Sequence, residues 1–174
     1  MACNQVLGGI PRDCESSIGG VKRVLFINHD QLGKVTIEEE TGIVTAIEPV
    51  NGGKFFEYYP KKDTASFAPV LQVGEGDNRS FKSTLTMNFG KMTASKRVQV
   101  NALLINELAA IIEDKNGNYW LAGKDSPLQA DPDSGGTTGA AMTDSNAYTV
   151  TMSEMSLTLH HPVDATIIDA LIGA

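Results

Sequence analysis

The 174-residue sequence lacks any apolar run of about 18 residues, the length that a membrane-spanning helix requires. No transmembrane segment is therefore predicted. Residues 1–15, MACNQVLGGIPRDCE, also lack a basic segment followed by an apolar run, so we expect no signal peptide. These absences favour a protein that is made, and then kept or assembled, in a cytoplasm.

Positive charge is in short supply. Lys and Arg total 14 against 21 Asp and Glu, which gives a formal net charge of −7 and a pI near 4.9. Tight binding of nucleic acid depends on clustered Lys and Arg, so this class of function is not predicted. A surface past which nucleic acid must slide is a different case, because an acidic face repels phosphates.

Cysteine is scarce, with only Cys3 and Cys14 in the chain. Two free thiols in a reducing compartment is the favoured interpretation, and a local disulfide remains open. A zinc site would need two more ligands, and the only adjacent histidines, His160 and His161, lie far away in sequence. We therefore expect no metal site.

Catalytic signatures are also missing. His29 lies in the turn-like HDQLG, and His160 and His161 end a predicted strand, but no nucleophile-elbow sequence accompanies them. Residues 74–76 and 134–137 resemble phosphate-binding loops only in their glycines, since both lack the GKS/T ending. No catalytic or cofactor-binding residue is predicted, and we expect the protein not to be an enzyme.

Two acidic motifs are weak candidates for cation binding. Residues 38–40 are three consecutive glutamates, which on a strand alternate between faces and favour a solvated edge. Residues 131–135, DPDSG, resemble part of a calcium loop but lack the twelve-residue ligand spacing and its terminal Glu. Neither motif predicts a metal site.

The composition, with 41% apolar and 20% charged residues, is that of one globular domain. Residues 1–20 form an irregular arm rich in Gly, Pro and polar residues, and residues 21–174 form a single β domain. A long Gly-rich loop is predicted at 123–147, and loops of this length are usually functional or disordered.

The clearest strand is at 79–89, where period-two alternation places apolar residues on one face and Lys, Thr and Asn on the other. Residues 21–28 form a strand that is apolar on both faces. Residues 34–40 are expected at an exposed edge, and Pro69 places the strand 64–73 near an edge or a bulge.

Two further strand predictions depend on local signals. The Asn-Gly-Gly sequence at 51–53 predicts a hairpin between 43–50 and 54–59. Residues 148–160 form a long strand whose apolar phase changes at Ser153-Glu154, which suggests a bulge.

A helix is predicted at 95–112 from an apolar stripe with three- and four-residue spacing, formed by Val98, Ala102, Ile105, Ala109 and Ile112. A hairpin through the turn at 114–117 follows, with Tyr119 and Trp120 on its return strand and Trp120 expected in the core. A short C-terminal helix is predicted at 162–174, opened by Pro162 with Asp164 in its first turn.

The predicted fold class is therefore mainly β, a sandwich or barrel with one mid-chain helix and a short C-terminal helix. In this order, the segments RSFKSTLTMNF, VNALLINELAAI, IIEDKNGNYWLAG and YTVTMSEMSLTLHHP resemble the tail tube proteins of long-tailed bacteriophages and their relatives in contractile injection machines. The resemblance is one of topology and covers roughly residues 21–162.

The resemblance implies a structural virion protein without catalytic residues, assembled in the host bacterial cytoplasm. Six copies would close a ring, rings would stack into a tube, and the arm and long loop would bridge neighbouring subunits. Other tail proteins would be partners, and DNA would pass through without specific binding. The C-terminal helix is not a required feature of that family, which leaves a tail-terminator, connector-ring or baseplate role open.

Two alternatives from other classes remain at this stage. A monomeric ligand-binding β-barrel predicts an apolar cavity and a copurifying ligand. An enzyme with a site borne on the loop 123–147 is the other, although no residue pattern favours it.

Overall fold

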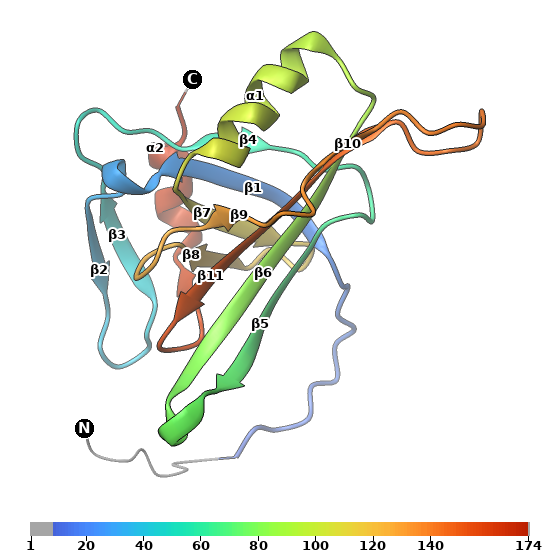
Figure 1. Cartoon of the computed structure of the whole chain (residues 1–174). Helices are drawn as coiled ribbons and strands as arrows, with labels where there is room; N and C mark the ends of the chain where they lie inside the picture. The colour runs from blue at the N-terminus through green and yellow to red at the C-terminus, as the bar shows by residue number, and fades with distance from the viewer. Residues whose placement is uncertain (1–8, 174) are drawn as a thin grey trace.

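The computed structural model describes residues 9–173, and with 44% strand and 15% helix the chain is mainly β, as predicted. The strands form two sheets (Figure 1). The first has seven strands in the order β2-β3-β12-β8-β7-β1-β4. The second has five, of which four follow the order β10-β11-β6-β5 and the fifth, β9, also pairs with β11. Neither sheet of the described residues closes, so the barrel alternative is wrong. The two sheets pack face to face in a sandwich-like arrangement.

The strands of the first sheet are β1 (Val21–Asn28), β2 (Lys34–Ile37), β3 (Val44–Glu48), β4 (Phe56–Tyr58), β7 (Leu108–Asp114), β8 (Tyr119–Ala122) and β12 (His161–Val163). Those of the second are β5 (Ser66–Val73), β6 (Arg79–Gly90), β9 (Gln129–Ala130), β10 (Gly135–Thr137) and β11 (Ala147–Ser156). The helices are α1 (Ala94–Ile105) and α2 (Ile168–Leu171), with short 3-10 turns η1 (His29–Gln31), η2 (Glu75–Asp77) and η3 (Ala165–Ile167).

The first sheet is buried on both faces, as the apolar pattern of β1 predicts. Val24 and Phe26 point into the core between the two sheets. Leu25 and Ile27 point into a second core on the far side, which α2 helps to cover. Full burial of such side chains contributes about 1.5–3 kcal/mol each, so the two cores fix this sheet in the middle of the molecule.

The alternation of β6 is confirmed. Leu85, Met87 and Phe89 are buried against the first sheet, while Thr86 and Asn88 are half-buried on the opposite face. The prediction of an edge position for the strand containing Pro69 is also confirmed, because β5 ends the second sheet. The second predicted edge strand, β2, ends the first sheet.

The predicted helix at 95–112 is wrong in its second half. Helix α1 begins after Thr93, whose side chain accepts the backbone N–H of Lys96, and it ends at Asn106, which is extended with ψ 155°. The next residues form β7, a strand buried on both faces. A short apolar run of this kind fits a helix and a doubly buried strand equally well.

The predicted helical stripe is wrong as well. Val98 is 60% exposed and Ile105 is 72% exposed, whereas Val100 and Leu103 pack into the core between the sheets. The predicted stripe includes Ala109 and Ile112, which belong to β7. Including them rotates the expected buried face of the helix away from the observed one.

The predicted hairpin between 43–50 and 54–59 does not form. The turn itself is present, with Asn51 at φ 55° and Gly52 at φ 71°. However, β3 pairs with β2 and β12, while β4 pairs with β1 at the other edge of the sheet. The turn therefore redirects the chain across the sheet rather than joining neighbouring strands.

The hairpin of β7 and β8 is confirmed, with Ile112 opposite Trp120 and Glu113 opposite Tyr119. Trp120 is half-buried rather than part of either core, and its indole N–H donates to Asp114 at 3.3 Å.

No bulge interrupts β11. Its pairing with β6 runs in unbroken register from Ala147 opposite Gly90 to Ser156 opposite Phe81. Glu154 therefore faces inward and is buried, and Met155 faces outward at 45% exposure. The predicted change of phase is wrong, because the apolar residues after Glu154 are exposed.

The C-terminal helix is shorter than predicted. Pro162 lies in β12 opposite Trp120 instead of opening a helix. Asp164 caps η3 by accepting the backbone N–H of Thr166 at 2.9 Å, and α2 follows directly.

Candidate assembly surfaces

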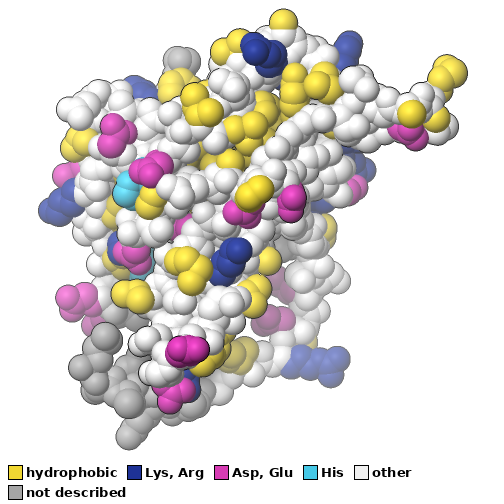
Figure 2. Space-filling model, viewed as in Figure 1, with side chains coloured by type: hydrophobic (Ala, Val, Ile, Leu, Met, Phe, Trp, Pro, Cys, Tyr) yellow, Lys and Arg dark blue, Asp and Glu magenta, His cyan; other side chains and the backbone are white. Residues whose placement is uncertain are grey.

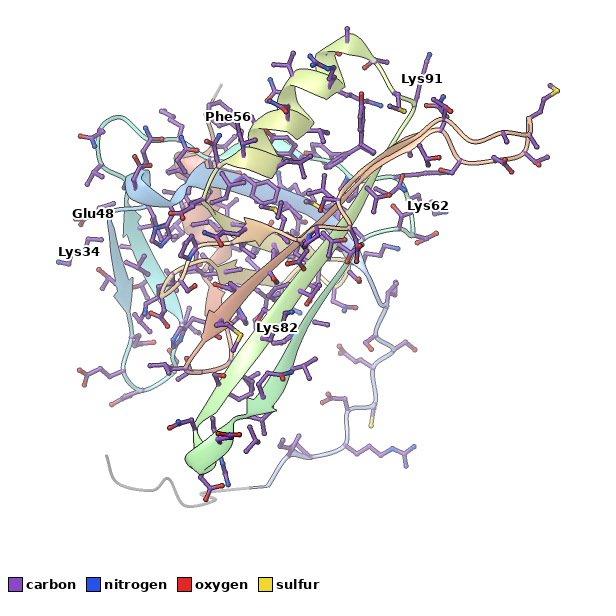
Figure 3. The ribbon with its side chains drawn as sticks, in the orientation of Figure 1. Lys34, Glu48, Phe56, Lys62, Lys82 and Lys91 are labelled. Carbon is purple, nitrogen blue, oxygen red and sulfur yellow. The ribbon has the colours of Figure 1, made fainter. Side chains whose placement is uncertain are left out.

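The outer face of the second sheet is left uncovered by the fold (Figures 1 and 2). Cross-strand pairing of β6 with β11 aligns hydroxyl and amide side chains on this face, and Asn88 donates to Thr149 at 3.3 Å. Lys82 is the one charged side chain among the outward positions of β5, β6 and β11 (Figure 3). The face therefore carries mostly hydroxyl and amide groups and little charge, with Val70 and Met155 exposed on either side of Lys82.

Both edges of this sheet are unpaired, since β5 and β10 end it within the described part of the chain. On β5, Val70, Leu71 and Val73 are 54%, 48% and 60% exposed. An open strand edge with exposed apolar side chains is a template for pairing with another chain. The edges therefore offer contacts that a single copy leaves unused.

The described part of the arm, residues 9–20, runs apart from both sheets until it reaches the β7–β8 turn (Figure 1). Residues 9–20 contain no helix or strand, and Ile10 is 98% exposed. The backbone of Ile18 pairs with the side-chain amide of Asn116 at 2.8 and 2.9 Å, and the carbonyl of Gly20 accepts the backbone N–H of Lys115 at 3.1 Å. Cys14 is exposed on this arm and Cys3 lies outside the described residues, so the alternatives for the two cysteines stay predictions.

The segment 123–147 contains β9 and β10, and beyond them residues 138–146 project away from the body (Figure 1). The carboxylate of Asp144 orders this projection by accepting the backbone N–H groups of Ala140 and Ala141 at 2.8 and 2.7 Å. These two hydrogen bonds hold the pKa of Asp144 below its ordinary value. Met142, inside the same turn, is fully exposed.

The three histidines are not brought together as a catalytic group. His29 is half-buried in η1. The side chain of His160 is bonded through Nε2 to Glu154 at 2.6 Å, and that of His161 through Nδ1 to the carbonyl of Gly42 at 2.9 Å. Each ring therefore holds a different part of the fold.

The remaining sequence motifs are placed as follows. Residues 38–40 are exposed in and beside a turn, residues 74–76 belong to the turn between β5 and β6, and residues 134–137 include β10. In the segment 131–135, Asp131 accepts the hydroxyl of Ser153 at 2.7 Å. Among residues 9–173, no three His, Cys, Asp or Glu side chains gather as a metal site would require.

Two acidic residues that the sequence motifs did not single out, Glu154 and Glu113, are buried. Glu154 accepts the backbone N–H of Gly123 at 2.6 Å in addition to its bond with His160. The signal was its shared parity with Val150 and Met152, which places it on the inner face of β11.

The other is Glu113 on β7, which is bound by Lys22 at 2.6 Å and by Arg23 from the neighbouring strand. Arg23 also pairs with Glu57 on β4, so one guanidinium joins three strands. Burial raises the pKa of Glu113, but hydrogen bonds from Lys22 and Arg23 and their charges outweigh it and lower the pKa below its ordinary value.

No described helix has the length and hydrophobicity that crossing a membrane requires. Comparison of the chain with protein-family models, with curated proteins and with solved structures finds no match.

Proposed function

We propose that this protein is a structural virion subunit that assembles with copies of itself into rings, and that the rings stack into a tail tube or connector. The observation that carries the proposal is the outer face of the second sheet, which is nearly uncharged, rich in hydroxyl and amide groups, uncovered and bounded by two open edges. Joining such sheets edge to edge in a ring removes the exposed edges that make a free subunit prone to aggregation.

The chemistry of this face suits a conduit. A channel for DNA must not hold phosphates tightly, and affinity for phosphate rises with the number of Lys and Arg contacts. Lys82 is the one such residue on the outward positions of β5, β6 and β11. Val70 and Met155 lie opposite it, and most of the other outward side chains of β6 and β11 are hydroxyl and amide groups. We therefore assign this face to the lumen, with DNA as passing cargo.

The arm and the projection at 138–146 are suited to bridging copies. Both extend from the body, and both carry exposed apolar side chains, Ile10 on the arm and Met142 on the projection. Neither residues 9–20 nor residues 138–146 contribute to the two cores. The six-fold ring and the partnership with other tail proteins rest on the resemblance to tail tube proteins.

Electron microscopy and sedimentation of the purified full-length chain, over a range of concentrations and salt, test the proposal. We expect rings or tubes. Deletion of residues 1–20 should leave a folded protein that no longer polymerises, because the arm lies outside both cores. As a matched control, Thr84→Ser on the outer face should assemble normally. A protein that stays monomeric under all conditions would contradict the proposal.

A further inference from the structure

An aromatic groove lies between β4 and α1, with a volume of about 680 Å³. Its apolar lining includes Phe56, Tyr58, Tyr59, Phe89 and Val100. Phe56 is 55% exposed and Tyr59 is 59% exposed, so these rings face solvent in a single copy. Figure 2 shows hydrophobic side chains gathered beside α1 at this end of the molecule.

The described lining of the groove contains two charged side chains, Glu57 and Lys96. Its one lining carboxylate, Glu57, is already paired with Arg23. Lys96 donates from its ammonium to the carbonyl of Gly90, and none of the ion pairs found among residues 9–173 involves it. An incoming segment therefore meets one ammonium group, that of Lys96, which no carboxylate of the described residues pairs with.

The opposite end of the molecule carries a complementary feature, the tip of the β5–β6 hairpin (Figure 1). Leu71 and Val73 are exposed just before the turn. The turn contains Glu75 and Asp77, both exposed, and Arg79 follows, which leaves the tip with one carboxylate in excess. Exposed apolar clusters rimmed by polar residues typically mark interaction sites.

The tip has a defined shape. Its turn is closed by a backbone hydrogen bond from Gly74 to the carbonyl of Asn78 at 2.8 Å, and the Asn78 side chain donates to the carbonyl of Glu75 at 3.2 Å. A preordered segment loses little conformational entropy on docking, which favours its use as a contact.

We propose that the β5–β6 tip of one copy seats in the β4–α1 groove of a second copy, with Val73 against Phe56 and the acidic turn near Lys96. The inference rests on the proposed function and identifies the contact by which successive rings stack. Because the tip and the groove lie at opposite ends of the chain, the contact is head-to-tail and repeats in one direction. Apolar surface is buried at both ends, and the charges are of opposite sign.

Disulfide trapping tests the contact. In a Cys3→Ser, Cys14→Ser background, one full-length chain carries Val73→Cys and another carries Phe56→Cys. Mild oxidation of the mixture should give on the order of ten-fold more dimer than a mixture in which Val50→Cys replaces Val73→Cys, because docking raises the effective thiol concentration. Val50 is a matched control, since it is 43% exposed but lies away from the tip.

Each result decides the matter. If the Val73→Cys chain oxidised alone gives as much dimer as its mixture with the Phe56→Cys chain, the tips meet each other. If the mixture gives no more dimer than the Val50→Cys control, something else, such as the arm of a second copy, fills the groove. Either result overturns the tip-in-groove contact. Assembly of rings or tubes without trapping leaves the proposed function standing, whereas a chain that stays monomeric overturns both.

Discussion

Replacing Glu154 with Ala should destabilise the fold strongly, because this carboxylate is the polar centre of a buried site. Glu154 is 5% exposed, and it accepts the backbone N–H of Gly123 and binds His160 Nε2, both at 2.6 Å. The other ring nitrogen of His160 has no hydrogen-bond partner among the described residues. Without Glu154, the ring and the Gly123 N–H are both left buried and unsatisfied.

The expected loss follows from these contacts. A buried polar group left without its partner costs about 1–3 kcal/mol, and two such groups remain in the variant. We expect a loss of about 3 kcal/mol or more, a large part of the roughly 5–15 kcal/mol that a domain of this kind possesses. Glu154→Gln keeps an oxygen that can accept from Gly123 and should lose only about 1 kcal/mol.

Urea titration monitored by the fluorescence of Trp120, the only tryptophan, measures the free energy of unfolding of each variant. Met155→Ala is the control, because Met155 is the next residue, faces outward and is 45% exposed. Its effect should stay within about 0.5 kcal/mol. If Glu154→Ala costs no more than this control, the carboxylate is in solvent, and the unbroken register of β11 is refuted.

Three further outcomes test other parts of the structure. Leu85→Asp buries an unpaired charge and should unfold the domain, whereas Thr86→Asp on the outer face should keep its circular dichroism spectrum and melting temperature within a few degrees. The pKa of Glu113 is lowered in the folded state, so its ion pairs stabilise the fold above the ordinary pKa and lose this effect as the pH falls through the folded pKa. Glu113→Gln should therefore lose about 1–3 kcal/mol of the free energy of unfolding at pH 7. In acid titration, the stability of this variant should depend less on pH than that of the parent. Gly123→Ala should lose about 2 kcal/mol or more in urea titration, since Gly123 has φ 79° and a Cβ would lie 2.7 Å from the β7 backbone, whereas Gly117→Ala, with φ 87° and open space, should lose less.

The strands β1 and β6 could be predicted because the local pattern of apolar and polar residues indicates which of their faces are buried. In β6, every second side chain enters the core, and period two has no other interpretation over that length. In β1, apolar residues on both faces correctly indicated a strand covered on both sides. The β7–β8 hairpin was predictable for the same kind of reason, since its turn residues lie directly between its strands.

The parts that were missed depend on contacts that are remote in sequence. Nothing local shows that β4 pairs with β1 rather than with β3, or that β12 lies between β3 and β8. The boundary between α1 and β7 was missed because burial on both faces removes the periodicity that distinguishes a strand from a helix. Glu113 was unpredictable as a core residue because its partners, Lys22 and Arg23, lie on a strand some 90 residues earlier.

The two sheets differ in what they leave available to a partner. The first sheet has a core on each face, so neither face can meet another molecule without unfolding part of the chain. The second sheet has a core on one face only, and its other face carries hydroxyl and amide groups between two open edges. Any extended β contact with another copy must therefore use the second sheet, or the single strands at the edges of the first.

A sheet that served only to close the core would need neither 12 residues in β6 nor a tip that extends past the core with exposed Leu71 and Val73. The length of this hairpin is explained when the sheet also forms contacts between molecules.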